Sequence, residues 1–194
     1  MGSAARDPGC ELHRASEAHR RPLRQRAAVV YVWILNVRRA GAADAAAIAA
    51  IIMPTIREGT TYALDADMSE ADALAYWFGP EKETFVAEKD GAILGTYYIR
   101  PNQAGGGRHV CNCGYVTSAQ ATGQGIARRM CEHSLAHARD KGYRAMQFNF
   151  VISTNERAVK LWQSLGFAIV GRLPLAFRHP TAGDVDALVM YRQL

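Results

Sequence analysis

The chain has 194 residues, of which 49% are hydrophobic and 21% charged, enough for one well-packed core and too few for two large domains. Its net charge of +5 arises within residues 1–39, where eight arginines face three acidic side chains, while residues 40–194 carry equal numbers of basic and acidic groups. A neutral body excludes the broad basic face of a nucleic-acid-binding domain.

Residues 1–33 are predicted to be a basic, disordered leader that precedes a single domain over 34–194. The leader mixes Arg, Ala, His and Pro without a usable apolar period. An apolar run over 27–35 follows a basic stretch and has the outline of a secretory signal. We favour the alternative that this run leads into the first strand, because cleavage near Ala42 would remove a strand that the pattern needs.

Cysteine usage and hydropathy favour a cytoplasmic protein. The four cysteines, Cys10, Cys111, Cys113 and Cys131, do not have the spacing of a disulfide framework, which fits a reducing compartment. No apolar run reaches the roughly 20 residues that a membrane span needs. Neither a membrane nor a nucleic acid is therefore an expected partner.

The first half of the domain is expected to contain a strand, two helices and a hairpin. A strand over about 34–39 precedes a helix over 44–54, which begins with an aspartate and is expected to end at its proline. A second helix over 69–78 begins with serine and acidic residues, which suit a helix N-terminus. Residues 84–100 form two antiparallel strands that divide at Asp90 and Gly91.

The second half is expected to alternate strands with helices. Its elements are a strand over 108–118, a helix over 125–140, a strand over 144–152, a helix over 154–166, and strands over 168–173 and 184–194, with Pro174 and Pro180 in the last loop. The order β-α-α-β-β-β-α-β-α-β-β predicts an α/β fold, a single domain with a mixed sheet of about seven strands and flanking helices.

Two of these strands carry an asparagine on a face where apolar residues are expected. Alternation places Val110, Asn112, Gly114 and Val116 on one face of their strand, and His109, Cys111, Cys113 and Tyr115 on the other. In the strand over 144–152, Met146, Phe148 and Phe150 share one face, and Gln147, Asn149 and Val151 share the other.

A glycine-rich turn, "SAQATGQGIARRM", lies between the strand over 108–118 and the helix over 125–140. Glycines let several backbone N–H groups point at one spot, and the helix N-terminus adds a partial positive charge, so a diphosphate is a natural ligand. The turn lacks the Lys-Ser/Thr of a P-loop, and Arg128 stands where a dinucleotide fingerprint has a small residue. On the glycines alone, an ordinary strand-to-helix turn is an equal alternative.

The string Gln120-x-x-Gly123-x-Gly125 is similar to the Gln/Arg-x-x-Gly-x-Gly/Ala signature of the GCN5-related N-acetyltransferases (GNAT). The element order over 34–194 also resembles that superfamily. The resemblance implies splayed central strands, acetyl-CoA as co-substrate, a turn that binds its pyrophosphate and a preceding strand that binds its pantetheine arm. The implied cofactor-binding residues are Tyr115, Val116, Thr117, Gly123, Gln124, Gly125, Ile126, Ala127 and Asn155.

A finer resemblance concerns the two asparagines. The strings "GTYYIRPNQAGGGRHVCNCGYV", "FNFVISTN" and "HPTAGDVDALVMYR" are similar to the branch that includes the proline-analogue (azetidine-2-carboxylate) N-acetyltransferases. The resemblance implies that Asn112 and Asn149 are catalytic and bind substrate. A neutral amide on each wall of a cleft can hold a carboxylate or steady a developing negative charge without desolvating an ion. The alternative is that both amides form hydrogen bonds with backbone groups that lack a ladder partner where the two strands diverge.

One position departs from the superfamily pattern. Many members have a Tyr that protonates the leaving thiolate, and Trp162 stands in its place in "NERAVKLWQSLGF". An indole N–H donates a hydrogen bond but is not an acid near neutral pH, so water or another group must supply the proton. The reaction also needs a neutral amine. Glu58 and His109 are candidate bases, and each is equally compatible with a solvated surface group.

Two other groups of residues invite functional interpretations that we do not favour. His133 and His137 are one helical turn apart, but no third ligand of suitable spacing is evident, so no metal site is predicted. Cys111 and Cys113 share a strand face and are predicted to be small packing residues rather than a redox pair.

The sequence therefore predicts a cytoplasmic acyltransferase, an acetyl-CoA-dependent N-acetyltransferase whose acceptor amine attacks the thioester directly. Positioning would supply most of the rate, and a backbone N–H near Val116 would polarise the thioester carbonyl. The acceptor is expected to be a small-molecule amine, an amino or imino acid, because the body has no charged groove. The alternatives are acetylation of a protein N-terminus or lysine, and a catalytically silent acyl-CoA sensor. A homodimer is compatible with the sequence.

Overall fold

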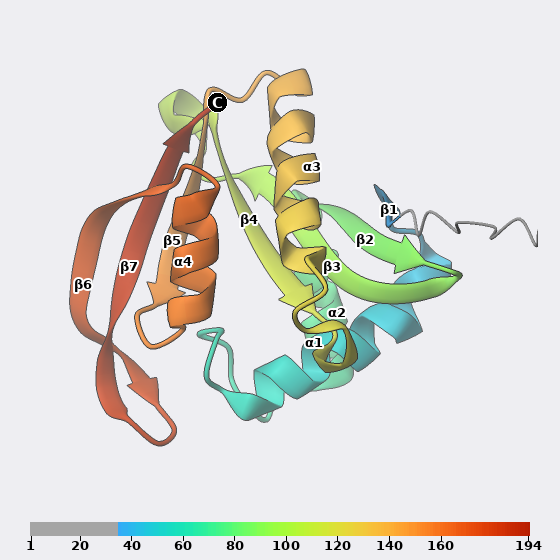
Figure 1. Cartoon of the computed structure of the whole chain (residues 1–194), viewed down its shortest axis with the longest axis horizontal. Coiled ribbons are helices and arrows are strands. Elements are labelled where there is room, and N and C mark those ends of the chain that lie inside the picture. The colour runs from blue at the N-terminus through green and yellow to red at the C-terminus, as the bar shows by residue number, and fades with distance from the viewer. Residues whose placement is uncertain (1–34) are drawn as a thin grey trace, which may run out of the picture. The chain divides into compact units, whose positions relative to one another are not determined.

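The computed structural model describes residues 35–194, so the predicted leader lies outside the described residues. The described residues form a seven-stranded sheet in the order β1-β2-β3-β4-β5-β7-β6, with helices on both faces (Figure 1). The strands are β1 (Asn36–Arg39), β2 (Glu83–Lys89), β3 (Ala92–Pro101), β4 (Val110–Thr117), β5 (Ala145–Ile152), β6 (Ala168–His179) and β7 (Gly183–Gln193). The predicted α/β fold class is confirmed.

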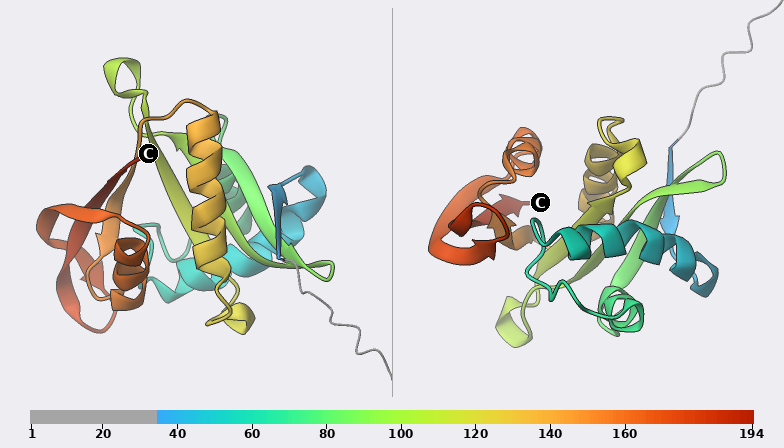
Figure 2. Two further views of the ribbon diagram at one scale, coloured as in Figure 1. Left: turned by 45° about the horizontal axis from the view of Figure 1, so that its top comes forward. Right: turned by 90° about the horizontal axis from the view of Figure 1, so that it is seen from below.

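Four α-helices within residues 35–194 cover the sheet, two on each face. They are α1 (Ala45–Glu58), α2 (Glu70–Trp77), α3 (Ile126–Asp140) and α4 (Glu156–Ser164). The right-hand view of Figure 2 shows α1 and α2 on one side of the sheet and α3 and α4 on the other. Ser69 begins α2 as predicted, because its hydroxyl accepts the Asp72 N–H at 3.1 Å. No helix among residues 35–194 is long and apolar enough to cross a membrane.

Each face of the sheet has its own hydrophobic cluster. Under α3 and α4, the cluster includes Cys111, Cys113 and Met130. Under α1 and α2, it includes Tyr98 and Val116. Successive β4 side chains therefore enter opposite clusters, as the alternation predicted, and Cys111 and Cys113 are packing residues.

The structure corrects two predicted boundaries that involve proline. The first helix does not end at Pro54 but continues to Glu58, because the proline removes only one helical hydrogen bond and Ile56 beyond it is buried. The left-handed Gly59, with φ 63°, ends the helix. β6 likewise continues past Pro174, which an edge strand tolerates because one of its sides has no partner.

A bulge in β5 changes which of its side chains face the core. Phe148 pairs with Met190 and Val151 pairs with Leu188, so β5 has one residue more than β7 over this interval. Val151 consequently packs against the same cluster as Phe148, whereas Phe150 contacts Phe177. The sequence prediction that Phe150 shares the face of Phe148, with Val151 opposite, is wrong because period-two alternation does not continue through a bulge.

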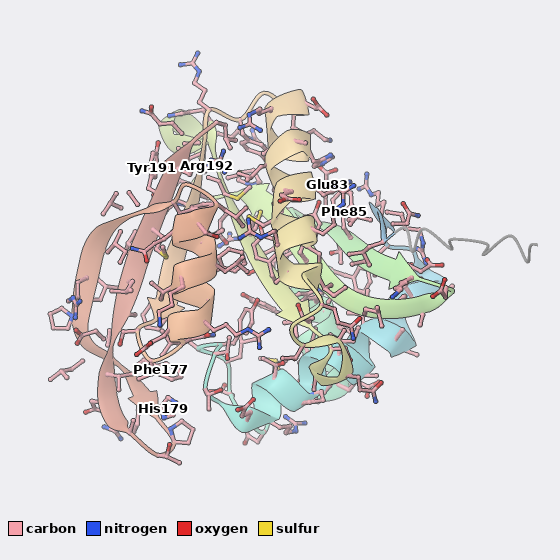
Figure 3. The ribbon with its side chains drawn as sticks, viewed as in Figure 1. Glu83, Phe85, Phe177, His179, Tyr191 and Arg192 are labelled. Carbon is pink, nitrogen blue, oxygen red and sulfur yellow. The ribbon has the colours of Figure 1, made fainter. Side chains whose placement is uncertain are left out.

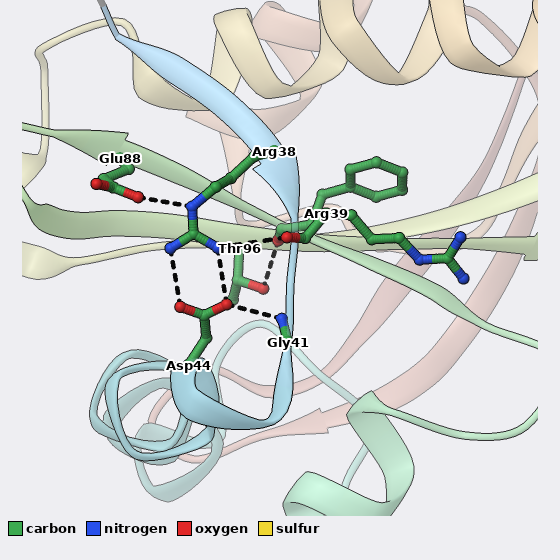
Figure 4. A network of polar contacts seen from close by, with 7 residues as sticks. Arg38, Arg39, Gly41, Asp44, Glu88 and Thr96 are labelled. Carbon is green, nitrogen blue, oxygen red and sulfur yellow. Dashed lines mark hydrogen bonds and ion pairs between the residues drawn. The ribbon is translucent and has the colours of Figure 1, made fainter.

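A partly buried ion pair connects the elements at the start of the domain. Arg38 on β1 donates to both carboxylate oxygens of Asp44, at 2.8 and 2.9 Å, and to Glu88 on β2 at 2.7 Å (Figure 4). The Gly41 N–H donates to Asp44 at 2.7 Å. These bonds connect the edge strand, the neighbouring strand and the residues that lead into α1.

Candidate active site

The sheet opens between β4 and β5, its only parallel neighbours among the described strands. Their ladder consists of Val110 opposite Ala145 and Cys111 opposite Met146, and beyond this point the strands diverge. A cleft of about 1350 Å³ occupies the opening. Its lining includes Tyr76 and Tyr98 from the α1 and α2 face and Ala127 and Trp162 from the α3 and α4 face, so it connects the two faces of the sheet.

The divergence leaves one edge of β4 facing the cleft. Ser118 N donates to Leu94 O, and Asn102 N donates to Val110 O. With the register between β3 and β4, these two bonds show which β4 residues form backbone hydrogen bonds to β3. By the antiparallel alternation, Val116 lies opposite Thr96 as a bonded pair, whereas Tyr115 and Thr117 direct their backbone groups toward the cleft. The backbone donors available to a ligand are therefore those of the odd-numbered residues, not that of Val116.

The loop between α1 and α2 is attached to this open edge. The Tyr62 hydroxyl donates to the Tyr115 carbonyl at 3.0 Å, and its ring packs edge-on against Trp77 at 5.9 Å. Desolvation raises the pKa of Tyr62, so the hydroxyl keeps its proton and remains a donor. Pro180, in the turn between β6 and β7, approaches Gly59 across the cleft, so this turn and the loop close the same end.

The glycine-rich turn lines the cleft from the face of the sheet that α3 and α4 cover, and it leads directly into α3. Gly123 and Gly125 have φ of 84° and 78°, a left-handed conformation that strains other residues. A Cβ atom on Gly125 would meet no protein atom within 4 Å. The first-turn amides of α3 have no intrahelical partner, and this turn contains no acidic residue. These features fit an anion such as a diphosphate.

Most of the predicted cofactor residues line the cleft. They are Tyr115, Val116, Thr117, Gly123, Gly125, Ile126, Ala127 and Asn155. Gln124 does not line it, and its side chain donates to the Gln120 carbonyl at 3.2 Å. Asn155 caps α4, where its side-chain oxygen accepts the Ala158 N–H at 3.2 Å. The amide nitrogen of Asn155 is therefore the group it can offer to a ligand.

Asn112 and Asn149 both line the cleft, and both also contact protein groups. The Asn112 amide donates to the Gln147 carbonyl at 2.9 Å, one residue beyond the last pair of the β4 and β5 ladder. This contact agrees with the alternative that the amide bonds a backbone group where the two strands separate. Asn149 accepts from the Gln147 side chain at 2.8 Å and donates to Asn102 at 2.7 Å. Asn112 Oδ1 accepts no hydrogen bond from the described residues. Every buried side-chain oxygen among residues 35–194 has a partner, so Asn112 Oδ1 is accessible, and it faces the cleft that Asn112 lines.

Trp162 forms part of the cleft wall beside Tyr115 and Phe148, with ring centroids 5.1 Å from each. Its indole N–H has no acceptor among the described residues. Because no buried side-chain nitrogen there lacks a partner, this N–H is accessible and faces the cleft. Tyr115 cannot take over the role of the tyrosine that Trp162 replaces, because the Tyr115 hydroxyl points into the core and bonds Ser134 at 2.6 Å. Burial raises the pKa of Tyr115 well above its ordinary value.

The structure separates the candidate bases. Glu58, at the end of α1, lines the cleft. His109 is exposed, contacts the Gly106 carbonyl at 3.1 Å and does not line the cleft. His179, which sequence reasoning did not single out, does line it, at the end of β6 near Phe177 (Figure 3). Its Nδ1 accepts the N–H groups of Thr181 and Ala182, which leaves Nε2 as a donor rather than a base.

The remaining titratable residues singled out from the sequence have structural partners. Burial raises the pKa of Cys113 well above that of a free thiol and that of Cys131 to about 12, so neither is a reactive thiolate. His133 contacts the Tyr97 hydroxyl at 2.7 Å, and His137 contacts Glu83 at 3.3 Å. No group of three metal-ligating side chains gathers within residues 35–194.

Sequence reasoning missed several residues of the cleft. Tyr76, Tyr98 and Arg100 line its α1 and α2 side, whereas Arg128 in α3 and Arg157 in α4 line the other side. Strand alternation alone puts Tyr98 and Arg100 on one face. It could not place them beside Asn112, because that requires the register between β3 and β4, where Arg100 is opposite Asn112.

Comparison with known proteins yields a consistent set of relatives. The Acetyltransferase (GNAT) family model matches residues 50–167. A GCN5-related N-acetyltransferase from Kribbella flavida is 42% identical, with a TM-score of 0.79 over 82% of this chain and 98% of that chain. The N-acetyltransferase aca1 of Schizosaccharomyces pombe is 29% identical over 69% of this chain and 72% of its own length. A phosphinothricin acetyltransferase from Sinorhizobium meliloti, solved with acetyl-CoA, shares the fold at 21% identity and a TM-score of 0.73, over 82% of this chain and 88% of its own.

Proposed function

The chain belongs to the acetyltransferase (GNAT) family, and we propose that it transfers the acetyl group of acetyl-CoA to the amine of a small amino or imino acid. The observation that carries the proposal is one cleft that connects the glycine-rich turn, whose free amides suit an anion, with polar side chains on the other face of the sheet. Two reactants can enter such a cleft from opposite faces of the sheet and meet at the open edge of β4. This arrangement suits direct transfer without an enzyme-bound intermediate.

The cofactor end is formed by backbone groups. The first-turn amides of α3, with Arg128 beside them, fit the pyrophosphate of acetyl-CoA, and the open edge of β4 fits an amide-containing arm. The co-substrate supplies the activated acetyl thioester. The backbone N–H groups of Tyr115 and Thr117, which face the cleft, would donate to its carbonyl, in place of the donor near Val116 that the sequence suggested.

The acceptor end is formed by side chains. Asn112 Oδ1 can accept a hydrogen from the acceptor amine, and Glu58 is the acidic group, among the described residues of the cleft, that can take its proton. The amine nitrogen then forms a bond to the acetyl carbon as the carbon–sulfur bond breaks. The Trp162 N–H can stabilise the thiolate by hydrogen bonding, and water supplies the proton.

The size of the acceptor distinguishes this proposal from acetylation of a protein. The loop bearing Tyr62 and the turn bearing Pro180 close the acceptor end of the cleft, which favours a small molecule over a polypeptide. This closure and the resemblance to the proline-analogue branch support an amino or imino acid as acceptor.

A screen for CoA release tests the proposal. Purified protein with acetyl-CoA is assayed against a panel of amino and imino acids, and against peptides with a free N-terminus or a lysine. We expect steady-state CoA release with at least one small acid and an acetylated product of matching mass. Peptide acetylation alone would favour the protein-directed alternative. Tight acetyl-CoA binding without any turnover would instead indicate a silent sensor.

A further inference from the structure

Arg100 lies at the acceptor end of the cleft, on the face of the sheet covered by α1 and α2. Its cross-strand neighbour is Asn112, and bonded antiparallel partners have Cα atoms about 5.5 Å apart with side chains on the same face. Tyr98 precedes it by two residues and shares this face. The Tyr98 ring lies over Gly114, where a Cβ atom would come within 2.7 Å of it. Arg100 thus forms part of a polar wall.

The guanidinium of Arg100 lacks a protein partner. It is half-buried, yet it makes no hydrogen bond or ion pair with any of residues 35–194. The other half-buried arginines that the structure describes differ in this respect: Arg38 pairs with two carboxylates and Arg192 donates to the Leu165 carbonyl. Because no buried side-chain nitrogen among residues 35–194 lacks a partner, these guanidinium nitrogens are accessible and have their donors free for a bound anion.

The surroundings of Arg100 have an excess of positive charge. Lys82 lies over the rings of Tyr76 and Tyr98, 3.3 and 4.2 Å from their centroids. Burial, with a smaller contribution from the charge of Arg100, lowers the pKa of Lys82 to about 8. Glu81 shares a separate hollow of about 280 Å³ with Arg100 but forms no ion pair with it.

Opposite charges line the cleft from different elements. Of the described lining residues, Glu58 alone is acidic, whereas Arg100 carries the positive charge of the acceptor end. A molecule with an amine and a carboxylate close together matches this arrangement. Its amine would meet Asn112 Oδ1 and its carboxylate would meet the neighbouring guanidinium, a group suited to bidentate carboxylate binding.

Building on the proposed function, we propose that Arg100 binds the carboxylate of the acceptor, so that the substrate class is free α-amino or α-imino acids. Amines without a carboxylate, carboxamides and protein N-termini lack the group that this arginine recognises. Arg100 is therefore a residue that determines acceptor specificity, and it takes no part in proton transfer.

The test compares each acceptor with its carboxamide. Wild type, Arg100→Gln, Arg100→Lys and the control Arg139→Gln, an exposed arginine of α3 outside both the cleft and the hollow, are assayed with the best acid and its amide. For the acid, we expect Arg100→Gln to lower kcat/KM by about 10- to 100-fold, mainly through KM. For the amide, kcat/KM should change less than about twofold, and Arg100→Lys should be intermediate because it keeps the charge without the planar fork. Acetyl-CoA affinity by calorimetry should stay constant.

The outcomes separate this inference from the function on which it rests. Equal losses for acid and amide in the two folded Arg100 variants, or a wild type that prefers the amide, would overturn the role of Arg100 and leave the acetyltransferase function standing. A wild type that acetylates no amino or imino acid would overturn both. If Arg100→Gln unfolds, the acid-to-amide preference of Arg100→Lys decides the matter, because an unchanged preference contradicts carboxylate binding.

Discussion

Asn112 illustrates how one residue can serve both the fold and the cleft. Its amide nitrogen extends the short ladder between β4 and β5 by bonding the Gln147 carbonyl, while its oxygen faces the acceptor end. A structural role and a substrate role are therefore not exclusive at this position. In Asn149 both amide groups have protein partners, so its removal also affects Asn102 and Gln147.

Replacing Asn112 by Ala is expected to have two separable effects. Loss of the bond to the Gln147 carbonyl should lower the free energy of unfolding by about 1 kcal/mol. Loss of the contact to the acceptor should lower kcat/KM by at least roughly tenfold, with acetyl-CoA affinity retained. Urea unfolding, calorimetry and steady-state kinetics measure the three quantities, and Asn36→Ala on the exposed edge strand is the control. Normal turnover in the folded variant would show that Asn112 is only structural.

The Arg38 and Asp44 pair predicts a response to acid. Hydrogen bonds from Arg38, and then from the Gly41 N–H, lower the pKa of Asp44 to about 2 from its ordinary value of 3.8. The folded pKa lies below the unfolded one, so the pair stabilises the fold fully above about pH 4, and this contribution disappears as pH falls through about 2.

Asp44→Asn should therefore lower stability by about 1 kcal/mol at pH 7, a value reduced by the partial exposure of Arg38. Between pH 4 and 2, the variant should lose less stability than the wild type, because it lacks the carboxylate that protonates. Urea unfolding at pH 7, 4 and 2.5 measures both effects, with the exposed Asp67→Asn as control. Parallel acid profiles for wild type and Asp44→Asn would contradict this account.

At the scale of elements, the start of α3 combines a strained turn with an electrostatic site. Two left-handed glycines expose the first-turn amides, and the first turn contains Arg128 and Arg129 instead of acidic residues. Cations at a helix N-terminus are unfavourable unless an anion binds nearby. The turn is thus better suited to a bound phosphate than to an empty state.

Gly125→Glu should abolish measurable acetyl-CoA binding, because it adds bulk and negative charge where the pyrophosphate is expected. Gly142→Glu provides a matched control, since Gly142 has φ of 80°, has open space around its Cβ position and follows the other end of α3. Both variants incur the same backbone strain, so calorimetry should show loss of binding in Gly125→Glu alone. Equal binding in the two variants would refute the phosphate site.

At the scale of the whole molecule, the described residues form one sheet of seven strands with a hydrophobic cluster on each of its faces. Residues 1–34 lie outside the described part, so the leader prediction depends on composition alone.

Deletion of residues 1–30 is expected to leave the melting temperature and the acetyltransferase activity nearly unchanged, because this segment has no periodic apolar face. Calorimetry of the shortened and full-length chains, together with their specific activities, provides the measurement. A marked loss of either property would show that the segment belongs to the functional domain.

Local signals in the sequence determined the element order, the fold class and the glycine-rich turn. The cap at Ser69, the hairpin turn at Asp90 and Gly91 and the alternation in β4 each depend on residues that are close in the chain, where sterics and hydrogen bonding act directly. The sequence prediction that Pro54 ends a helix and that Pro174 lies in a loop is wrong. Pro54 and Pro174 both lie inside elements, because packing beyond a proline can outweigh one lost hydrogen bond.

Tertiary structure alone decided which side chains meet. The pairing of Arg100 with Asn112, the bond from Asn112 to Gln147 and the bulge that moves Val151 into the core all depend on strand register. Register depends on segments of the chain that are far apart in sequence, and a shift of one residue in a strand moves its side chains to the other face of the sheet. The sequence by itself therefore determined that an acetyl-CoA-binding turn was to be expected, whereas only the assembled sheet decided which groups face the acceptor.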